Sequence, residues 1–167
     1  MSVVRRLRAD DEPFLREMFL ETFFWSEDRP RLSIDQVLAV PSLAKYIAGW
    51  GRPGDAGVIA ESDSGERLGA AWHRLFSAAD HGYGFVSADV PEIGIAVRKG
   101  DRGRGVGRSL MEGLIELARE TGLPGLSLSV EDGNSRAAHL YESLGFVRVE
   151  RVQTAWTMVL MLARPRA

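Results

Sequence analysis

The 167-residue sequence contains no cysteine, and this absence removes several kinds of chemistry at once. Disulfides, thiolate metal sites and a cysteine nucleophile are all excluded. No window approaches the roughly 18 consecutive apolar residues of a membrane-spanning helix. Residues 1–13 turn acidic before any apolar signal-peptide segment begins. We therefore expect a soluble, cytoplasmic protein with no membrane partner.

The composition is that of one ordinary folded domain. Apolar residues make up 45% of the chain and charged residues 26%, as is usual for globular proteins. No repeat and no long linker divides the sequence, so we expect a single domain over residues 1–167. The three histidines, His73, His81 and His139, lack the spacing of metal ligands, and we expect no metal.

The segment 91–111 combines an apolar run, a polar turn and a glycine-rich stretch. Residues 92–97 are typical of a buried strand, and apolar residues recur at helical spacing from Val106 onward. Glycines between a strand and a helix allow several backbone N–H groups to converge on one phosphate, where the helix dipole adds positive charge. The part of the segment from residue 98 to residue 108 carries five cations and one acid in a chain of net charge −2: Arg98, Lys99, Arg102, Arg104 and Arg108, with Asp101. This pattern favours a small phosphorylated ligand over a nucleic acid, and we expect no nucleic-acid partner.

The glycine spacing narrows the choice of ligand. A P-loop requires a lysine after its glycines, and the dinucleotide-binding pattern requires glycine at position 108 or 110, where Arg108 and Leu110 stand. The pattern that remains is Arg-x-x-Gly-x-Gly, at Arg102, Gly105 and Gly107. This pattern resembles the acyl-CoA-binding motif of the GCN5-related N-acetyltransferase (GNAT) superfamily. Taken alone, the motif also fits a tight strand-to-helix connection in an ordinary α/β domain.

A second motif follows one helix and one strand later. Residues 134–146, from Asn134 through Tyr141 to Gly145-Phe146, resemble the second signature of the same superfamily. Two motifs in the expected order and separation are more specific than either alone. The resemblance extends over essentially the whole chain and is strongest from residue 92 to residue 146.

Hydrophobic periodicity predicts the order β-α-α-β-β-β-α-β-α-β-β. We expect Asp10 or Asp11 to cap the first helix. A capping box at Ser33 and Gln36 predicts a second helix that continues to about residue 50, interrupted at Pro41. The order matches an α/β (α+β) architecture, the acyl-CoA N-acyltransferase fold of the superfamily. That fold has a mixed, mainly antiparallel sheet of six to seven strands flanked by helices on both faces.

The resemblance implies an N-acetyltransferase that moves the acetyl group of acetyl-CoA directly to a primary amine in a ternary complex. In the family, the glycine loop holds the diphosphate of coenzyme A and the preceding strand holds the pantetheine arm. The small residue Gly94 inside that strand is consistent with close approach of a ligand. The residues implied to bind the coenzyme are Ile95, Ala96, Val97, Arg102, Gly103, Arg104, Gly105, Val106, Gly107, Arg108, Asn134 and Tyr141.

Two residues are candidates for proton transfer. Tyr141 matches the tyrosine that commonly protonates the departing thiolate, and a phenol with a pKa near 10 stays protonated at neutral pH. The alternative for Tyr141 is a core tyrosine. Glu92 opens the buried strand, where a carboxylate with a raised pKa could deprotonate the amine through water. The alternative for Glu92 is a strand end that faces solvent.

The amine acceptor is the least determined part. Phe24, Trp25 and Trp72 are candidates for its binding site, and the alternative for residues 23–25 is a core cluster with one exposed edge. Relatives that acetylate ribosomal-protein N-termini carry a glutamate where Ser129 stands here, which counts against that activity. The acceptor is expected to be a small molecule, a peptide or a protein amine, and acidic surface elsewhere favours a cationic one. Dimers are common among relatives, so a homodimer is compatible with the resemblance. The alternative function is a non-catalytic acyl-CoA-binding sensor or regulatory module.

Overall fold

The computed structural model describes residues 2–162, and the chain divides into two compact units. Unit 1 consists of Met1–Trp72 and Gly94–Leu114, and unit 2 consists of His73–Ile93 and Ile115–Ala167. Strand β3 (Arg67–Arg74), strand β4 (Glu92–Val97) and helix α4 (Val106–Glu120) contribute residues to both units.

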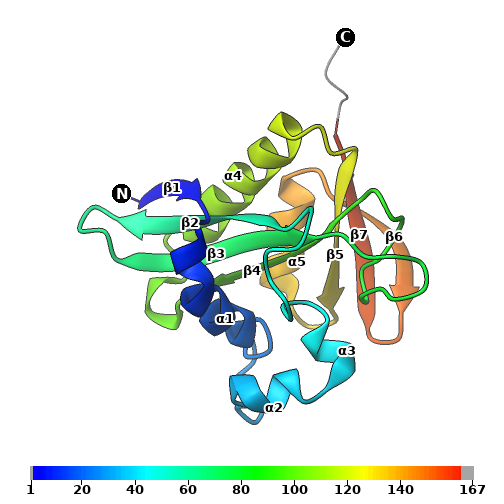
Figure 1. Ribbon diagram of the computed structural model, residues 1–167, viewed down its shortest axis with the longest axis horizontal. Coiled ribbons are helices and arrows are strands. Elements are labelled where there is room, and N and C mark those ends of the chain that lie inside the picture. The colour runs from blue at the N-terminus through cyan, green and yellow to red at the C-terminus, as the bar shows by residue number, and fades with distance from the viewer. Residues whose placement is uncertain (1, 163–167) are drawn as a thin grey trace. The chain divides into compact units, whose positions relative to one another are not determined.

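Seven strands form one sheet in the order β1-β2-β3-β4-β5-β7-β6 (Figure 1). The pairs β1–β2, β5–β7 and β6–β7 are antiparallel, whereas β4 and β5 are parallel. The sequence expectation of a mixed, mainly antiparallel sheet of six to seven strands is therefore confirmed. The strands are β1 Ser2–Arg6, β2 Ala56–Ser62, β3 Arg67–Arg74, β4 Glu92–Val97, β5 Gly125–Glu131, β6 Val147–Val152 and β7 Ala155–Met161.

Unit 1 holds a core between helix α1 (Glu12–Glu21) and its strands. The apolar residues that recur at helical spacing in α1 are buried, with Leu15, Met18 and Phe19 in one cluster with Ile59 of β2 and Trp72 of β3. Helical spacing brings these three side chains to one side of α1, which explains why the periodicity was sufficient to identify the helix.

The second helix differs from the expectation. Ser33 and Gln36 do form the predicted capping box, with Gln36 N donating to Ser33 Oγ at 3.2 Å and Ser33 N donating to Gln36 Oε1 at 2.8 Å. The helix that follows, α2 (Ile34–Leu38), is short, and Pro41 begins a separate helix, α3 (Pro41–Ala44). Proline lacks an N–H and clashes with the preceding turn, so it begins a helix more readily than it continues one. The interruption at Pro41 is confirmed, but the prediction that the helix continues to about residue 50 is wrong, because residues 45–51 form turns.

Asp11 does not cap α1 with its side chain. Its carboxylate is fully buried and accepts bonds from Arg5 at 2.7 and 2.9 Å, from Arg67 Nε at 2.9 Å and from Arg8 N at 2.7 Å. These arginines, Arg5 first, hold the pKa of Asp11 far below its usual range. The expected cap is thus replaced by an ionic link between β1, the 3₁₀ turn Ala9–Asp11 and β3.

Unit 2 contains β5, β6 and β7 with helix α5 (Ser135–Ser143) and the connection 77–90. This connection is irregular, with one isolated bridge between Ser87 and Val90. It lies against the sheet, because a Cβ atom on Gly84 would meet the backbone of Leu128 in β5 at 2.6 Å. Tyr83 O also accepts a bond of 3.3 Å from Thr157 Oγ1 of β7. Within residues 2–162, none of the helices has the length and apolar character needed to cross a membrane.

Candidate coenzyme and catalytic site

The glycine loop leads directly into a long helix. After β4 ends at Val97, a 3₁₀ turn (Lys99–Asp101) precedes the loop, and helix α4 begins at Val106 and continues to Glu120. Gly103 and Gly105 adopt φ values of +78° and +83°, as expected for residues that must enter the left-handed region. The first backbone N–H groups of a helix lack intrahelical partners, so those at the start of α4 can bind an anion.

Acidic side chains lie near each of the five cations of this segment. The five pairs and their N–O distances are Arg98–Glu66 (2.5 Å), Lys99–Glu27 (3.1 Å), Arg102–Glu21 (3.3 Å), Arg104–Asp101 (3.9 Å) and Arg108–Glu112 (3.9 Å). The longest two distances belong to Arg104 and Arg108, whose side chains are 73% and 47% exposed. Exposed pairs at this distance contribute little free energy. The exposed side chains of Arg104 and Arg108 therefore lie where an incoming phosphate can reach them.

Arg102 is held differently. Its Nε donates to Val97 O, the last carbonyl of β4, at 3.1 Å, and its terminal nitrogen donates to Glu21 Oε2 at 3.3 Å. This side chain ties the glycine loop to β4 and to α1. The sequence offered no signal for Glu21, because 81 residues separate it from Arg102.

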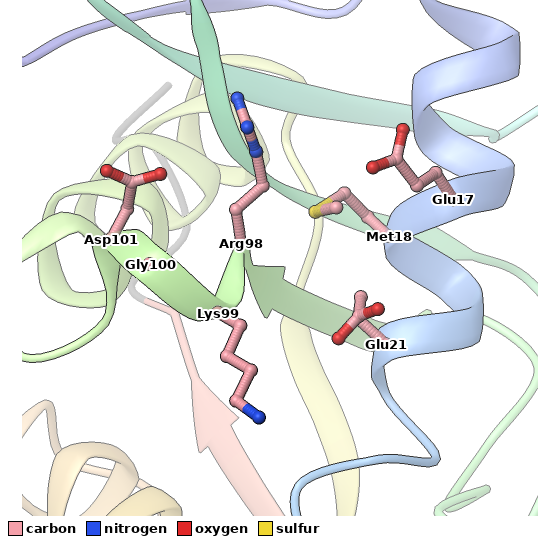
Figure 2. A pocket seen from close by; sticks show the side chains of 7 residues that line it. All are labelled: Glu17, Met18, Glu21, Arg98, Lys99, Gly100 and Asp101. Atoms are coloured by element: carbon pink, nitrogen blue, oxygen red, sulfur yellow. The ribbon is translucent and has the colours of Figure 1, made fainter. Parts of the chain in front are cut away.

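A pocket of about 240 Å³ lies beside this loop in unit 1. Figure 2 shows Glu17, Met18 and Glu21 extending from α1 toward the segment that follows β4. That segment contributes the remaining lining residues, Arg98, Lys99, Gly100 and Asp101. The lining carries both signs of charge and one thioether, so it suits a polar, charged group better than an apolar one.

Glu92 is buried in unit 2. It begins β4, is 6% exposed and pairs with Ser127 in the parallel ladder to β5. Its Oε1 accepts a bond of 3.0 Å from Gly84 N, so the connection 77–90 covers it. The alternative reading of Glu92 as a solvent-facing strand end is therefore wrong.

Helix α5 carries Asn134 and Tyr141. Asn134 is the N-cap, and its side-chain oxygen accepts from Ala137 N at 3.4 Å, which leaves the amide nitrogen as a donor for a ligand. Tyr141 is 9% exposed, and its ring lies 5.9 Å from that of Phe146. Burial raises the pKa of Tyr141 to about 12. The phenol is therefore protonated at neutral pH, as both a general acid and a core tyrosine would be.

The three aromatic candidates occupy different environments. Trp72 is 3% exposed and belongs to the core of unit 1. A Cβ atom on Gly94 would lie 2.6 Å from two carbons of the Trp72 indole, so this ring, rather than a ligand, accounts for the glycine. The burial of Trp72 does not support the expected contact with an acceptor. Phe24 is buried, whereas Trp25 is partly exposed, which matches the alternative of a core cluster with one exposed edge.

Arginines lie over both neighbouring rings of that cluster. The guanidinium of Arg31 is 5.1 Å from the ring centre of Phe24, and that of Arg29 is 5.3 Å from Trp25. Such contacts are weakly attractive where they are exposed. Among residues 2–162, no group of three or more His, Asp or Glu side chains is arranged to hold a metal ion.

Residues 10–146 match the sequence model of the acetyltransferase (GNAT) family. A mycothiol acetyltransferase of Corynebacterium kroppenstedtii is 36% identical over 107 residues, which cover 64% of this chain and 29% of that protein. An L-methionine sulfoximine/L-methionine sulfone acetyltransferase of Pseudomonas aeruginosa is 34% identical over 89 residues, covering 53% and 49%. The chain thus spans less than half the length of these two curated relatives.

A solved structure shares the fold over most of the chain. A GNAT superfamily phosphinothricin acetyltransferase from Sinorhizobium meliloti, in complex with AcCoA, superposes with a TM-score of 0.68. The two sequences are 17% identical, and the match covers 96% of this chain and 88% of the other.

Proposed function

This chain belongs to the acetyltransferase (GNAT) family, and we propose that residues 1–167 act as one N-acetyltransferase domain that moves the acetyl group of acetyl-CoA directly to a primary amine. The observation that carries the proposal is the glycine loop. Its two left-handed glycines lead into the N-terminus of α4, and the exposed Arg104 and Arg108 flank it. Backbone N–H groups and exposed cations at one helix start are suited to a diphosphate.

In this proposal the coenzyme uses the motif residues of the family. The loop from Arg102 to Arg108 binds the diphosphate, with Arg102 acting mainly by fixing the loop. Backbone groups of residues 95–97 in β4 bind the pantetheine arm and the thioester. The side-chain nitrogen of Asn134 donates to the pantetheine arm.

The reaction requires two proton movements. The neutral amine attacks the thioester carbonyl, the new C–N bond forms, and the C–S bond breaks to release the thiolate of coenzyme A. Tyr141, protonated because burial holds its pKa at about 12, gives its proton to that thiolate. Glu92 accepts the proton that the amine nitrogen loses, through a water molecule. Both groups then exchange protons with solvent, and the site returns to its first state.

The acceptor is a primary amine, and its class can be bounded by two arguments. The curated relatives are named as a mycothiol acetyltransferase and an L-methionine sulfoximine/L-methionine sulfone acetyltransferase, and these names favour small amines with polar substituents as the first candidates. The acids Glu17 and Glu21 at the charged pocket favour a cationic group in the same molecule. A panel should therefore contain amino-acid derivatives such as L-methionine sulfone, polyamines and peptide N-termini.

Two measurements on the purified chain test the proposal: calorimetry with acetyl-CoA at modest salt, and thiol release with the amine panel, with products identified by mass. Heat on binding together with thiol release supports the enzyme. Binding without thiol release from any amine would support the sensor alternative. If acetyl-CoA produces no heat on mixing and no rise in the melting temperature of the protein, coenzyme binding is rejected altogether.

A matched pair of variants sharpens the binding test. Gly105→Ala and Gly122→Ala each place a side chain at a positive φ, +83° and +74°, with open space around the new Cβ. Both should destabilise the fold by a similar amount, about 1 kcal/mol. Only Gly105→Ala should also weaken acetyl-CoA binding, because Gly122 follows the far end of α4. Equal affinity in the two variants would contradict the assignment of the loop.

A further inference from the structure

Glu21, the last residue of α1, accepts hydrogen bonds from two arginines of different segments. Its Oε2 accepts from Arg102 of the glycine loop at 3.3 Å, and its Oε1 accepts from Arg31 at 3.4 Å. The Glu21 side chain is only 15% exposed, so its charge is shielded from water more than that of an ordinary surface glutamate. All three residues belong to unit 1.

The Arg102 contact fixes the loop at its first motif residue. A guanidinium is planar, and here its Nε and one terminal nitrogen are used by two partners, Val97 O and Glu21. With both bonds made, the orientation of the Arg102 side chain relative to β4 and α1 is set. The backbone of Arg102 is continuous with Gly103, the first left-handed residue of the loop, so the same two bonds restrain the loop.

The Arg31 contact links the same carboxylate to segment 22–33, which connects α1 to α2. Arg31 also lies over the ring of Phe24, and Phe24 N donates to Glu21 O at 3.1 Å. Trp25, one of the acceptor candidates, is the next residue in this segment. Figure 2 shows the Glu21 side chain between α1 and the segment that follows β4.

We propose that Glu21 is a positioning residue that orients the coenzyme loop through Arg102 and couples that loop to segment 22–33 through Arg31. This inference rests on the proposed function, in which the loop holds the diphosphate of acetyl-CoA. Occupation of the loop changes the restraint on Arg102, and Glu21 transmits the change to Arg31 and to the aromatic residues beside it.

The electrostatic effect and the positioning effect of Glu21 predict opposite changes in the affinity for acetyl-CoA when this side chain is replaced. Removing a negative charge beside a diphosphate site strengthens binding of the anion by Coulomb attraction alone. Removing a group that orders the loop weakens binding, because the loop must then be ordered when the ligand arrives. The direction of the change in affinity therefore identifies which effect dominates.

The test compares Glu21→Gln with Glu27→Gln. Glu27 is a matched control because it pairs with Lys99 of the same segment at 3.1 Å, but the side chains of both Glu27 and Lys99 are largely exposed. We expect Glu21→Gln to raise the Kd and the KM for acetyl-CoA roughly tenfold with little change in kcat, the effect of losing a hydrogen bond between charged groups. We expect Glu27→Gln to bind acetyl-CoA as tightly as the wild type or slightly more tightly.

S-acetylpantetheine, which lacks the diphosphate, distinguishes positioning of the loop from general damage. At a saturating concentration of the amine, where binding of the acceptor no longer limits the rate, Glu21→Gln should leave kcat/KM for this donor unchanged. The positioning role would be overturned if kcat/KM fell equally for acetyl-CoA and for S-acetylpantetheine. It would also be overturned if the variant bound acetyl-CoA as tightly as the wild type or more tightly. Arg102→Gln should likewise weaken acetyl-CoA binding and leave the use of S-acetylpantetheine unchanged. The double variant should lose no more acetyl-CoA affinity than the weaker-binding single variant. If Glu21→Gln does not fold, Glu21→Asp takes its place: this variant keeps the charge and shortens the side chain, so a lower acetyl-CoA affinity supports positioning and an unchanged affinity overturns it.

The coupling is read from Trp25. The difference in fluorescence between the wild type and Trp25→Phe isolates the signal of this residue from those of Trp50, Trp72 and Trp156. Saturating acetyl-CoA should change that signal in the wild type and not in the Glu21→Gln background. The same change in both backgrounds would refute the coupling. Failure of the wild type itself to bind acetyl-CoA would reject the proposed function instead, so the two failures are distinguishable.

Discussion

Gly94→Ala tests why the central strand carries a glycine at this position. A methyl group at Gly94 would lie 2.6 Å from Cε2 and Cζ2 and 2.9 Å from Nε1 of Trp72, distances that packed atoms do not adopt. Trp72 is buried in the core of unit 1, so its ring has little room to move away. Overpacking of this kind costs about 2 kcal/mol, which for a chain of this length lowers the melting temperature by roughly 4 to 8 °C.

Gly100→Ala is the matched control. Gly100 has no atom within 4 Å of an added Cβ and lies six residues further along the same segment. We expect its melting temperature to stay within about 1 to 2 °C of the wild type, as for a neutral surface substitution. In a Trp72→Phe background, Gly94→Ala should cost less, because phenylalanine lacks the indole atoms that the methyl group meets.

Thermal unfolding of the four variants, with acetyl-CoA affinity measured on each, decides between the two explanations. If Gly94→Ala has the same melting temperature as Gly100→Ala, the steric argument from Trp72 is refuted. If its melting temperature is unchanged while its affinity for acetyl-CoA falls, the glycine is there for the ligand, as the sequence suggested.

Three further results are expected. Tyr141→Phe should lower kcat by roughly 100-fold or more, with the affinity for acetyl-CoA nearly unchanged. The control Tyr83→Phe, at an exposed position, should leave kcat unaltered. Equal kcat values in both variants would remove Tyr141 from the mechanism. Because burial raises the pKa of Tyr141 from 10.0 to about 12, the folded state gains stability below pH 10 that is lost as the pH rises to 12. The loss, on the order of 2 to 3 kcal/mol, should be seen in denaturant titrations of the wild type and be missing from Tyr141→Phe. Asp11→Ala should lower the free energy of unfolding by about 3 kcal/mol, because it removes the buried partner of Arg5. Asp10→Ala should lower it by less than about 0.5 kcal/mol. Similar unfolding midpoints for the two variants would show that the ionic link contributes little.

Local patterns in the sequence were sufficient for the elements around the candidate site. The strand, loop and helix from residue 92 to residue 120 follow from an apolar run, a glycine-rich stretch and helical periodicity, all read within a few neighbouring residues. The capping box at Ser33 and the left-handed Gly103 and Gly105 were predictable for the same reason. Short-range rules failed for the side-chain cap at Asp11 and for the length of the second helix, which ends at Leu38 and is followed by a separate short helix from Pro41.

Only the tertiary structure decided which distant groups meet. Asp11 became the partner of Arg5 and of Arg67, which is 56 residues away, instead of a helix cap. Glu21 became the partner of Arg102, which is 81 residues away. Glu92 is buried because residues 77–90 fold over it, and Gly94 is required because Trp72 lies on it. A single sequence records the types of these side chains but not their distances. Charge pairing and steric exclusion depend on distance, so they are determined only when the chain has folded.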